Sequence, residues 1–112
     1  MPKPQPGTPV RGSQSGRPIM ALLDLLGRRW AMRALWEIDQ APCSFRDLQE
    51  RCGQISSSVL NARLAELREA ALVDQGEQGY ELTALGQELM QHLAPLRRWA
   101  DKWGKQLPAS DE

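Results

Sequence analysis

The sequence predicts a mainly α-helical domain of the α+β class, with a helix-turn-helix followed by a short two-stranded hairpin. Apolar residues recur at helical spacing through most of the chain, and a glycine-containing turn at 53–55 separates two of the helices. Two short segments with alternating apolar residues then flank a second glycine-containing turn at 76–79. A chain of 112 residues, 41% of them hydrophobic, can form one modest core, so we expect a single folded domain.

Composition divides the chain into three parts. Residues 1–16 contain four prolines and three glycines, and they cannot bury enough apolar surface to offset the loss of chain entropy. We therefore expect a flexible tail at 1–16, a folded domain at 17–105 and a polar end at 106–112. The tail carries Lys3 and Arg11, which would suit a basic arm in a DNA groove, although an ordinary disordered end is the simpler interpretation.

Hydropathy and charge narrow the class of protein. The chain has no apolar run of about 18 residues and no signal peptide at its start, so we expect a cytoplasmic protein without a membrane segment. It has 14 basic and 14 acidic residues, and residues 17–83 carry eight basic against ten acidic side chains. Bulk charge therefore gives no support for nucleic-acid binding, and an anion-binding surface requires local segregation of charge.

The first two helices are predicted by apolar spacing. Pro18 suits a first helical turn, and the apolar positions that follow it are Ile19, Leu22, Leu23 and Leu26. Gly27 interrupts this pattern. A second helix follows, with apolar positions at Trp30, Ala34, Leu35 and Ile38, and it is expected to stop at Ala41-Pro42.

The next two helices form the helix-turn-helix. Ser44 is a suitable N-cap with Asp47 three residues later, and the helix at 45–52 has Phe45, Leu48 and Cys52 as its apolar residues. After the turn, Ser56 is expected to cap a helix at 57–71. The inward stripe of that helix is Leu60, Leu64, Leu67 and Ala71.

The remaining elements are the hairpin and a long helix. Strands are expected at 72–75 and 80–82, and Thr83 should cap a helix at 84–105. Pro95 lies inside the apolar pattern of this helix, so we expect it to bend or divide the helix. A helix-turn-helix with a two-stranded ribbon directly after it is the layout of a winged helix domain.

Several segments also resemble the HxlR-type winged-helix transcriptional regulators. They are Leu-Gly-basic-Trp at 26–30, Phe-x-x-Leu at 45–48, Ile-Ser at 55–56, Leu-x-x-Leu-x-x-x-x-Leu-Val at 64–73 and Tyr-x-Leu-Thr-x-x-Gly at 80–86. The match covers about residues 18–103, and the order and spacing of the fragments make it specific. The resemblance implies a homodimeric bacterial or archaeal repressor or activator.

Two features depart from the pattern of that family. Many members have Cys-Pro before the first helix, and in a redox-sensing subset that thiol is the sensor, whereas this chain has Arg17-Pro18. The wing is also shorter and more acidic than in the family, with Asp74, Glu77 and Glu81. The resemblance therefore implies neither the cysteine sensor nor a wing that contacts DNA.

The helix at 57–71 has the features of a helix that enters the major groove. With its leucine stripe inward, helical geometry points Ser58 and Ala62 outward and places Ser57 and Asn61 at one flank. These first two turns are slim and polar and carry no carboxylate, as a helix among phosphates requires. The expected DNA-contacting residues are Ser56, Ser57, Ser58, Asn61 and Ala62, and a merely solvated face is the alternative.

Arginines in neighbouring segments are candidates for phosphate contacts. Arg46 lies in the first turn of the helix that crosses the DNA backbone in such motifs, and Arg28 and Arg29 begin a helix that often supports the same face. Arg63 is nearer the inner side of its helix. It either reaches a phosphate or forms a salt bridge with Glu66 or Asp47.

The last helix is longer than one small domain needs, and it carries two tryptophans near its end. Aromatic residues are enriched at protein interfaces, so we expect a homodimer. The expected interface residues are Ile19, Leu22, Leu23, Leu89, Leu93, Leu96, Trp99 and Trp103. The alternative is that the same residues cover the core of a monomer.

Other chemistry has little support in the sequence. Cys52 falls on an apolar stripe, whereas Cys43 precedes a helix N-cap, where a thiolate would be somewhat stabilised and a redox role is a minor alternative. One histidine, His92, without a ligand cluster predicts no metal and no cofactor. The chain has no nucleophile–base set and no phosphate-binding glycine loop, so we do not expect an enzyme.

The combined prediction is a sequence-specific DNA-binding regulator, a homodimer that reads a pseudo-palindromic operator through the helix at 57–71. Its expected partners are double-stranded DNA, a second copy of the chain and an unidentified small-molecule effector. The alternative is a winged helix used as a protein-interaction or dimerisation module. The net charge of −2 over residues 17–83 and the acidic wing favour that alternative.

Overall fold

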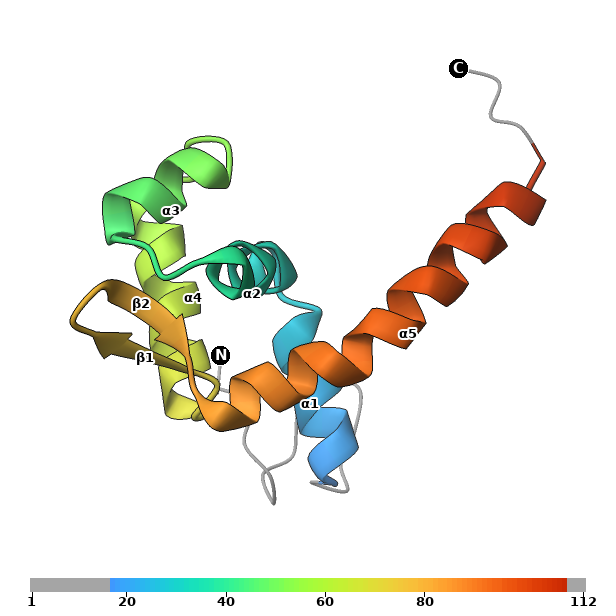
Figure 1. Ribbon diagram of the computed structural model, residues 1–112, viewed down its shortest axis with the longest axis horizontal. Helices are drawn as coiled ribbons and strands as arrows, with labels where there is room; N and C mark the ends of the chain where they lie inside the picture. Colours follow the sequence, from blue (N-terminus) through green and yellow to red (C-terminus); the bar gives the residue numbers. More distant parts are fainter. Residues whose placement is uncertain (1–16, 109–112) are drawn as a thin grey trace.

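The computed structural model describes residues 17–108 as a winged helix-turn-helix (Figure 1). The elements are α1 Pro18–Leu26, α2 Ala31–Gln40, α3 Phe45–Arg51, α4 Ser57–Glu69, β1 Val73–Gly76, β2 Gly79–Leu82 and α5 Ala84–Gln106. The predicted fold class, mainly helical α+β with a short two-stranded wing, is confirmed. The tail expected at 1–16 lies outside the described residues.

One apolar core joins the helices to the wing. Its most deeply buried large residues are Leu35, Leu48, Leu60 and Leu67, which come from α2, α3 and α4. These are positions that helical spacing predicted to face inward. The other elements add Leu25, Val73, Leu82 and Met90 to the same cluster. The core therefore fixes α3 and α4, which form the helix-turn-helix, against α2 and the wing.

Side-chain caps fix the starts of two helices where the sequence predicted them. The hydroxyl group of Ser44 accepts a hydrogen bond of 3.0 Å from the amide group of Asp47. The hydroxyl group of Thr83 accepts one of 3.0 Å from Gly86 and donates one of 2.6 Å to the carbonyl group of Ala71. Thr83 therefore caps α5 and also ties its start to the segment between α4 and β1.

The wing is a tight hairpin with a third strand-like contact. Gly76 pairs with Gly79, so only two residues form the turn between β1 and β2. Tyr80 also exchanges two backbone hydrogen bonds with Cys43, of 3.1 and 2.8 Å. Gly79 has φ +110°, and a Cβ atom there would collide with the carbonyl oxygen of Cys43. Only glycine fits this close approach of the wing to the α2–α3 segment.

Helix α5 is a single helix that extends away from the rest of the molecule (Figure 1). The division expected at Pro95 does not occur. Pro95 is exposed, so water can bond the carbonyl group that a proline leaves without an amide partner. From Pro95 to Pro108 every residue is exposed, and the distal half of α5 meets the folded body through Arg97, whose guanidinium group lies 3.7 Å from the centre of the Trp36 ring.

Candidate nucleic-acid interface

The turn between α3 and α4 sets the direction of α4. Gly53 and Gln54 both adopt left-handed backbone conformations, with φ of +78° and +65°. The side-chain amide of Gln49 in α3 donates to the carbonyl group of Ile55, at 2.9 Å, and to the hydroxyl group of Ser57, at 3.1 Å. Ile55 is buried under the turn. These contacts hold the start of α4 against α3 without closing it off from solvent.

Three exposed serines stand at the N-terminus of α4, each with a different contact. Ser56 is the N-cap, and its hydroxyl group accepts a 3.3 Å hydrogen bond from the amide of Val59. Ser57 accepts from Gln49, and Ser58 lies 3.5 Å from the hydroxyl group of Ser56. The positive end of the helix dipole lies beneath them, so this end of α4 favours an anion such as a phosphate.

The exposed face of α4 continues into its second turn. Asn61 is exposed, and Ala62 is half-buried beside it. Leu60, Leu64 and Leu67 are buried, so the helix has the orientation that its apolar stripe predicted. The first carboxylate of the helix is Glu66, in the third turn. A slim, uncharged, polar face of this kind suits the floor of a major groove.

Two of the predicted arginines lie on the surface. The side chain of Arg46 is 88% exposed, and its nearest acid, Glu50, is 3.9 Å away and itself exposed. An ion pair that is so long and so solvated contributes little, so Arg46 is available to a phosphate. Arg29 is also exposed, with its guanidinium group 5.4 Å from the centre of the Trp30 ring.

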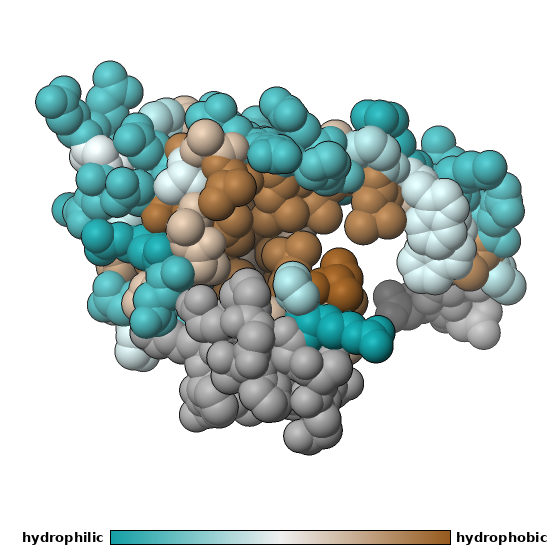
Figure 2. Space-filling view, turned by 90° about the horizontal axis from the view of Figure 1, so that it is seen from below, coloured by the Kyte–Doolittle hydropathy of each residue, from teal (hydrophilic) through white to brown (hydrophobic). Residues whose placement is uncertain are grey.

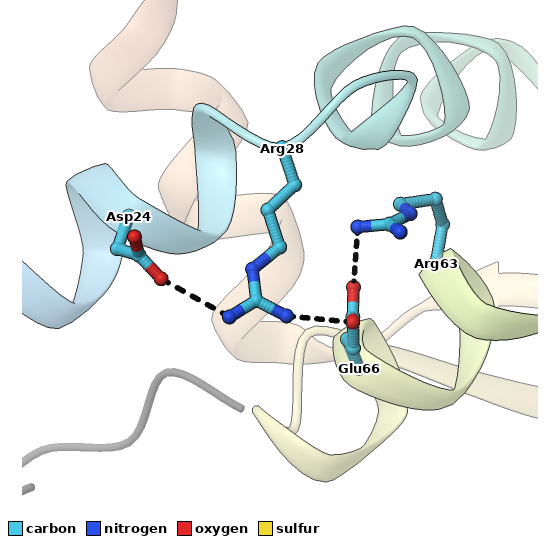
Figure 3. A network of polar contacts seen from close by, with 4 residues as sticks. All are labelled: Asp24, Arg28, Arg63 and Glu66. Carbon is cyan, nitrogen blue, oxygen red and sulfur yellow. Dashed lines mark hydrogen bonds and ion pairs between the residues drawn. The ribbon is translucent and has the colours of Figure 1, made fainter. Parts of the chain in front are cut away.

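The other two predicted arginines belong to a network of ion pairs (Figure 3). Arg28 donates to Glu66 at 2.7 Å and to Asp24 at 3.2 Å, and its side chain is only 7% exposed. Arg63 donates to the other oxygen of Glu66 at 3.0 Å. The structure thus gives Arg28 an inward position, where a phosphate contact would require breaking a buried pair. For Arg63 it shows the salt bridge with Glu66 that the sequence left as an alternative.

The Arg63–Glu66 pair is one of the alternatives expected from the sequence, but neither the contact of Arg28 with Glu66 nor the role of Gln49 was predicted. Arg28 and Glu66 are 38 positions apart, and their meeting depends on the packing of the segment between α1 and α2 against α4 rather than on local spacing. One feature of the sequence did indicate a pairing role for Glu66. It lies next to the buried stripe of α4, at an i,i+3 distance from Arg63.

Cys43 does not match the expectation of a stabilised thiolate, whereas Cys52 lies in the core as its apolar stripe predicted. Cys43 is 1% exposed and Cys52 is 2% exposed. Burial raises the pKa of the Cys43 thiol, and the charge of Arg51 only partly opposes this effect. Burial likewise raises the pKa of Cys52, against a smaller effect of Arg33. In this environment the thiols stay protonated, because an apolar environment disfavours the thiolate.

A second exposed surface is apolar and lies on α1 and α5. Leu23, Leu96, Trp99 and Trp103 are each more than half exposed, as is Ile19. The rings of Trp99 and Trp103 stack at 5.9 Å. Leu22, Leu89 and Leu93 are half-buried. The face that carries α1 shows a hollowed area of apolar side chains (Figure 2). We call this set of eight residues the apolar face.

The described residues hold no group of three or more His, Cys, Asp or Glu side chains arranged for a metal ion. Within the same residues, no helix is both long and apolar enough to cross a membrane.

The fold and the exposed α4 define a class, the winged helix-turn-helix transcriptional regulators. Residues 25–108 match the model of the HxlR-like helix-turn-helix family. The match spans most of the chain, and the chain belongs to this family. The resemblance stated from sequence is thereby confirmed. Members of the family are transcriptional regulators, which act by binding DNA and are not in general enzymes.

Similar proteins agree with this assignment. An HTH-type transcriptional regulator of Methanocaldococcus jannaschii is 29% identical over 89 residues, which are 75% of this chain and 83% of the relative. The quinone-bound YodB of B. subtilis has a similar structure, with a TM-score of 0.70 and 28% identity, over 75% of this chain and 96% of YodB. A possible HxlR family transcriptional factor of Thermoplasma volcanium shares the fold, with a TM-score of 0.64 and 24% identity, over 76% and 83% of the two chains.

Proposed function

We propose that the protein is a sequence-specific, homodimeric DNA-binding regulator that reads a pseudo-palindromic operator through the N-terminal turns of α4. The observation that carries the proposal is the exposed, uncharged polar face formed by Ser56, Ser57, Ser58 and Asn61. In this proposal the start of α4 enters the major groove. The amide group of Asn61 pairs with an adenine, and the serine hydroxyl groups bond a base edge or a phosphate.

The phosphate contacts that we propose come from Arg46 and Arg29. Both are exposed, and Arg46 is on α3, the helix that crosses the backbone in a helix-turn-helix. The N-terminus of α4 adds a further anion site. Arg28 is left out of this set because its side chain is buried in ion pairs with Asp24 and Glu66.

The apolar face supports the homodimer. Residues such as Trp99 and Trp103 are about half exposed rather than packed over the core, so they do not serve to cover a monomer. Solvent-exposed groups of large apolar side chains are typical of protein interfaces. A two-fold axis through this face would place two copies of α4 roughly one DNA turn, about 34 Å, apart, and this spacing predicts a pseudo-palindromic operator.

An unidentified small-molecule effector is part of the proposal. The relative YodB was solved with a quinone bound. In this chain Cys43 and Cys52 are both buried, so we propose that an effector binds without attack by a thiol.

The proposal is tested by selecting genomic fragments with the purified full-length chain and footprinting the enriched sequence. We expect an inverted repeat with half-sites one DNA turn apart. Asn61→Ala should then weaken binding to this operator by about 1–3 kcal/mol and relax the preference at one base pair in each half-site. An operator that binds the Asn61→Ala protein unchanged would exclude Asn61 from base readout.

Arg46→Ala is the matched control for readout of sequence. Its loss should weaken binding to operator and scrambled DNA alike and lower the salt dependence of both. A loss confined to the operator would mean that Arg46 contacts a base and that α3, not α4, lies in the groove.

The second candidate is a winged helix that binds another protein and not DNA. The acidic wing favours it, since Asp74, Glu77 and Glu81 would face phosphates if the wing lay on the backbone. The selection experiment separates the two candidates. Recovery of no enriched sequence, together with a dimer in solution, would support the protein-interaction module.

A further inference from the structure

Glu66 is a buried acid that holds two arginines beside the recognition helix (Figure 3). One of its oxygens accepts from Arg28 at 2.7 Å and the other accepts from Arg63 at 3.0 Å. Its side chain is 9% exposed, against 7% for Arg28 and 19% for Arg63. The second acid of the network is Asp24, which pairs with Arg28 at 3.2 Å.

The network neutralises Arg63, the charged residue that is nearest in sequence to the proposed groove-binding face. Arg63 is only two positions after Asn61, and the first two turns of α4 carry no other charged side chain. With Arg63 paired, the start of α4 offers DNA its serines, its asparagine and its helix dipole, but no mobile guanidinium group. Phosphate contacts by such groups supply most of non-specific affinity, because each one releases counterions whatever the sequence.

We propose that Glu66 is a specificity-determining positioning residue, which suppresses non-specific DNA binding by holding Arg63 in an ion pair away from the phosphates. This inference rests on the proposed function, since it takes α4 as the helix that meets DNA. Glu66 itself touches no base. It acts through Arg63, and through its bond to Arg28 it also fixes the turn of α4 that carries Arg63 against the segment between α1 and α2.

Arg63 is the arginine that loss of Glu66 would release. Arg28 keeps Asp24 as a partner when the charge of Glu66 is removed. Arg63 has no second acid among the described residues, its Nε atom makes no hydrogen bond, and its side chain is the more exposed of the two. A long, flexible guanidinium side chain in this position can turn toward the backbone of DNA lying along α4.

The test is Glu66→Gln in the full-length chain, with binding to a scrambled duplex measured by fluorescence anisotropy over a range of salt concentrations. Glutamine keeps the size and helix propensity of glutamate but loses its charge. We expect the salt slope on scrambled DNA to steepen by about 0.9, which corresponds to one added phosphate contact, and the affinity at 0.1 M salt to rise about five- to tenfold. An unchanged slope would overturn the inference.

Two double variants separate the release of Arg63 from the change in net charge. Glu66→Gln/Arg63→Gln and Glu66→Gln/Arg68→Gln both restore the original charge, and Arg68 is an exposed arginine later on the same helix. We expect the first to return to the wild-type slope and the second to keep the steeper one, after correction with Arg68→Gln alone. An equal return in both would show a charge effect only and would contradict the assignment of Arg63.

Arg63→Gln alone tests the inference without disturbing the Glu66–Arg28 bond. If Arg63 is withheld from DNA in the wild-type protein, this variant leaves the salt slope unchanged, whereas a fall of about one means that Arg63 already contacts a phosphate and the inference is wrong. Thermal melts of each variant verify folding. Failure of the proposed function is separate, because it would appear as a wild-type protein that binds no genomic sequence in preference to scrambled DNA.

Discussion

At the scale of single residues, the three serines at the start of α4 have different environments despite their identical side chains. Ser56 caps the helix, and Ser57 is engaged by Gln49 from α3. Ser58 has only a long 3.5 Å contact with Ser56. The serine hydroxyl that is freest to bond DNA is therefore that of Ser58, followed by Ser57, which retains a proton to donate.

The buried thiols predict a stability that falls at high pH. Burial raises the pKa of Cys43 and of Cys52 above the ordinary value of 9.0. Below pH 9 the thiols are protonated in both the folded and the unfolded chain. Just above pH 9 the unfolded chain loses these protons while the folded chain keeps them. As the pH rises from 8 to 10, urea-induced unfolding should show a lower free energy, by up to about 1.4 kcal/mol per pH unit and thiol. Cys43→Ala/Cys52→Ala should lack this part of the fall, and a thiol that reacts rapidly in the native protein at pH 8 would contradict the prediction.

Residue patterns predicted the buried leucines and the caps, because these depend on neighbours within one or two turns. The positions of Arg28 and Cys43 could not be predicted in the same way. Arg28 looked like a surface arginine at a helix start, and only the approach of α4 supplies Glu66. Cys43 looked like a loop residue, and its burial follows from backbone pairing with Tyr80, which is a long-range contact.

At the scale of elements, the bounds of α4 and of the wing were predicted to within about two residues. Helix 57–71 is observed as Ser57–Glu69, and the strands at 72–75 and 80–82 are observed as Val73–Gly76 and Gly79–Leu82. Helical periodicity and glycine turns fix such bounds locally. Of the two expected effects of Pro95, division of the helix does not occur, since a proline on an exposed helix face loses a hydrogen bond that water replaces.

The contact between the wing and the α2–α3 segment predicts a different cost for two glycine substitutions. Gly79→Ala should destabilise the fold by about 3 kcal/mol, because φ is +110° and the added Cβ atom meets the backbone of Cys43 and Ser44. Gly53→Ala has a similar backbone requirement, with φ +78°, but open space around it, so we expect about 1 kcal/mol. Chemical denaturation of the two variants measures both values, and equal losses would mean that the wing adjusts freely.

At the scale of the whole molecule, the DNA-binding end and the apolar face are separate surfaces of one chain. Figure 1 shows α3 and α1 at opposite ends of the folded body, with α5 extending beyond it. A dimer through α1 and α5 would leave both α4 N-termini exposed. The separation allows assembly and DNA binding to be altered independently.

Trp103→Glu should convert the proposed dimer to a monomer while each chain remains folded. A charge at this half-exposed position would be buried unpaired at the interface, but it would remain solvated in the single chain. Sedimentation equilibrium measures the change. Leu85→Glu is the matched control, because Leu85 is equally exposed but lies at the other end of α5 outside the apolar face. An unchanged mass for the tryptophan variant would remove this residue from the interface.

The protruding half of α5 also links secondary structure to protein concentration. Residues 96–106 form about three exposed helical turns, and Arg97 ties them to the folded body through its guanidinium group, which lies 3.7 Å from the centre of the Trp36 ring. Isolated helices of this length are only marginally stable in water. A lone chain would therefore fray beyond Arg97 and expose Arg98 to trypsin, whereas a paired chain would be protected. Helical content and resistance to digestion should both fall on dilution, so that this C-terminal end of α5 completes its folding only when the chain associates.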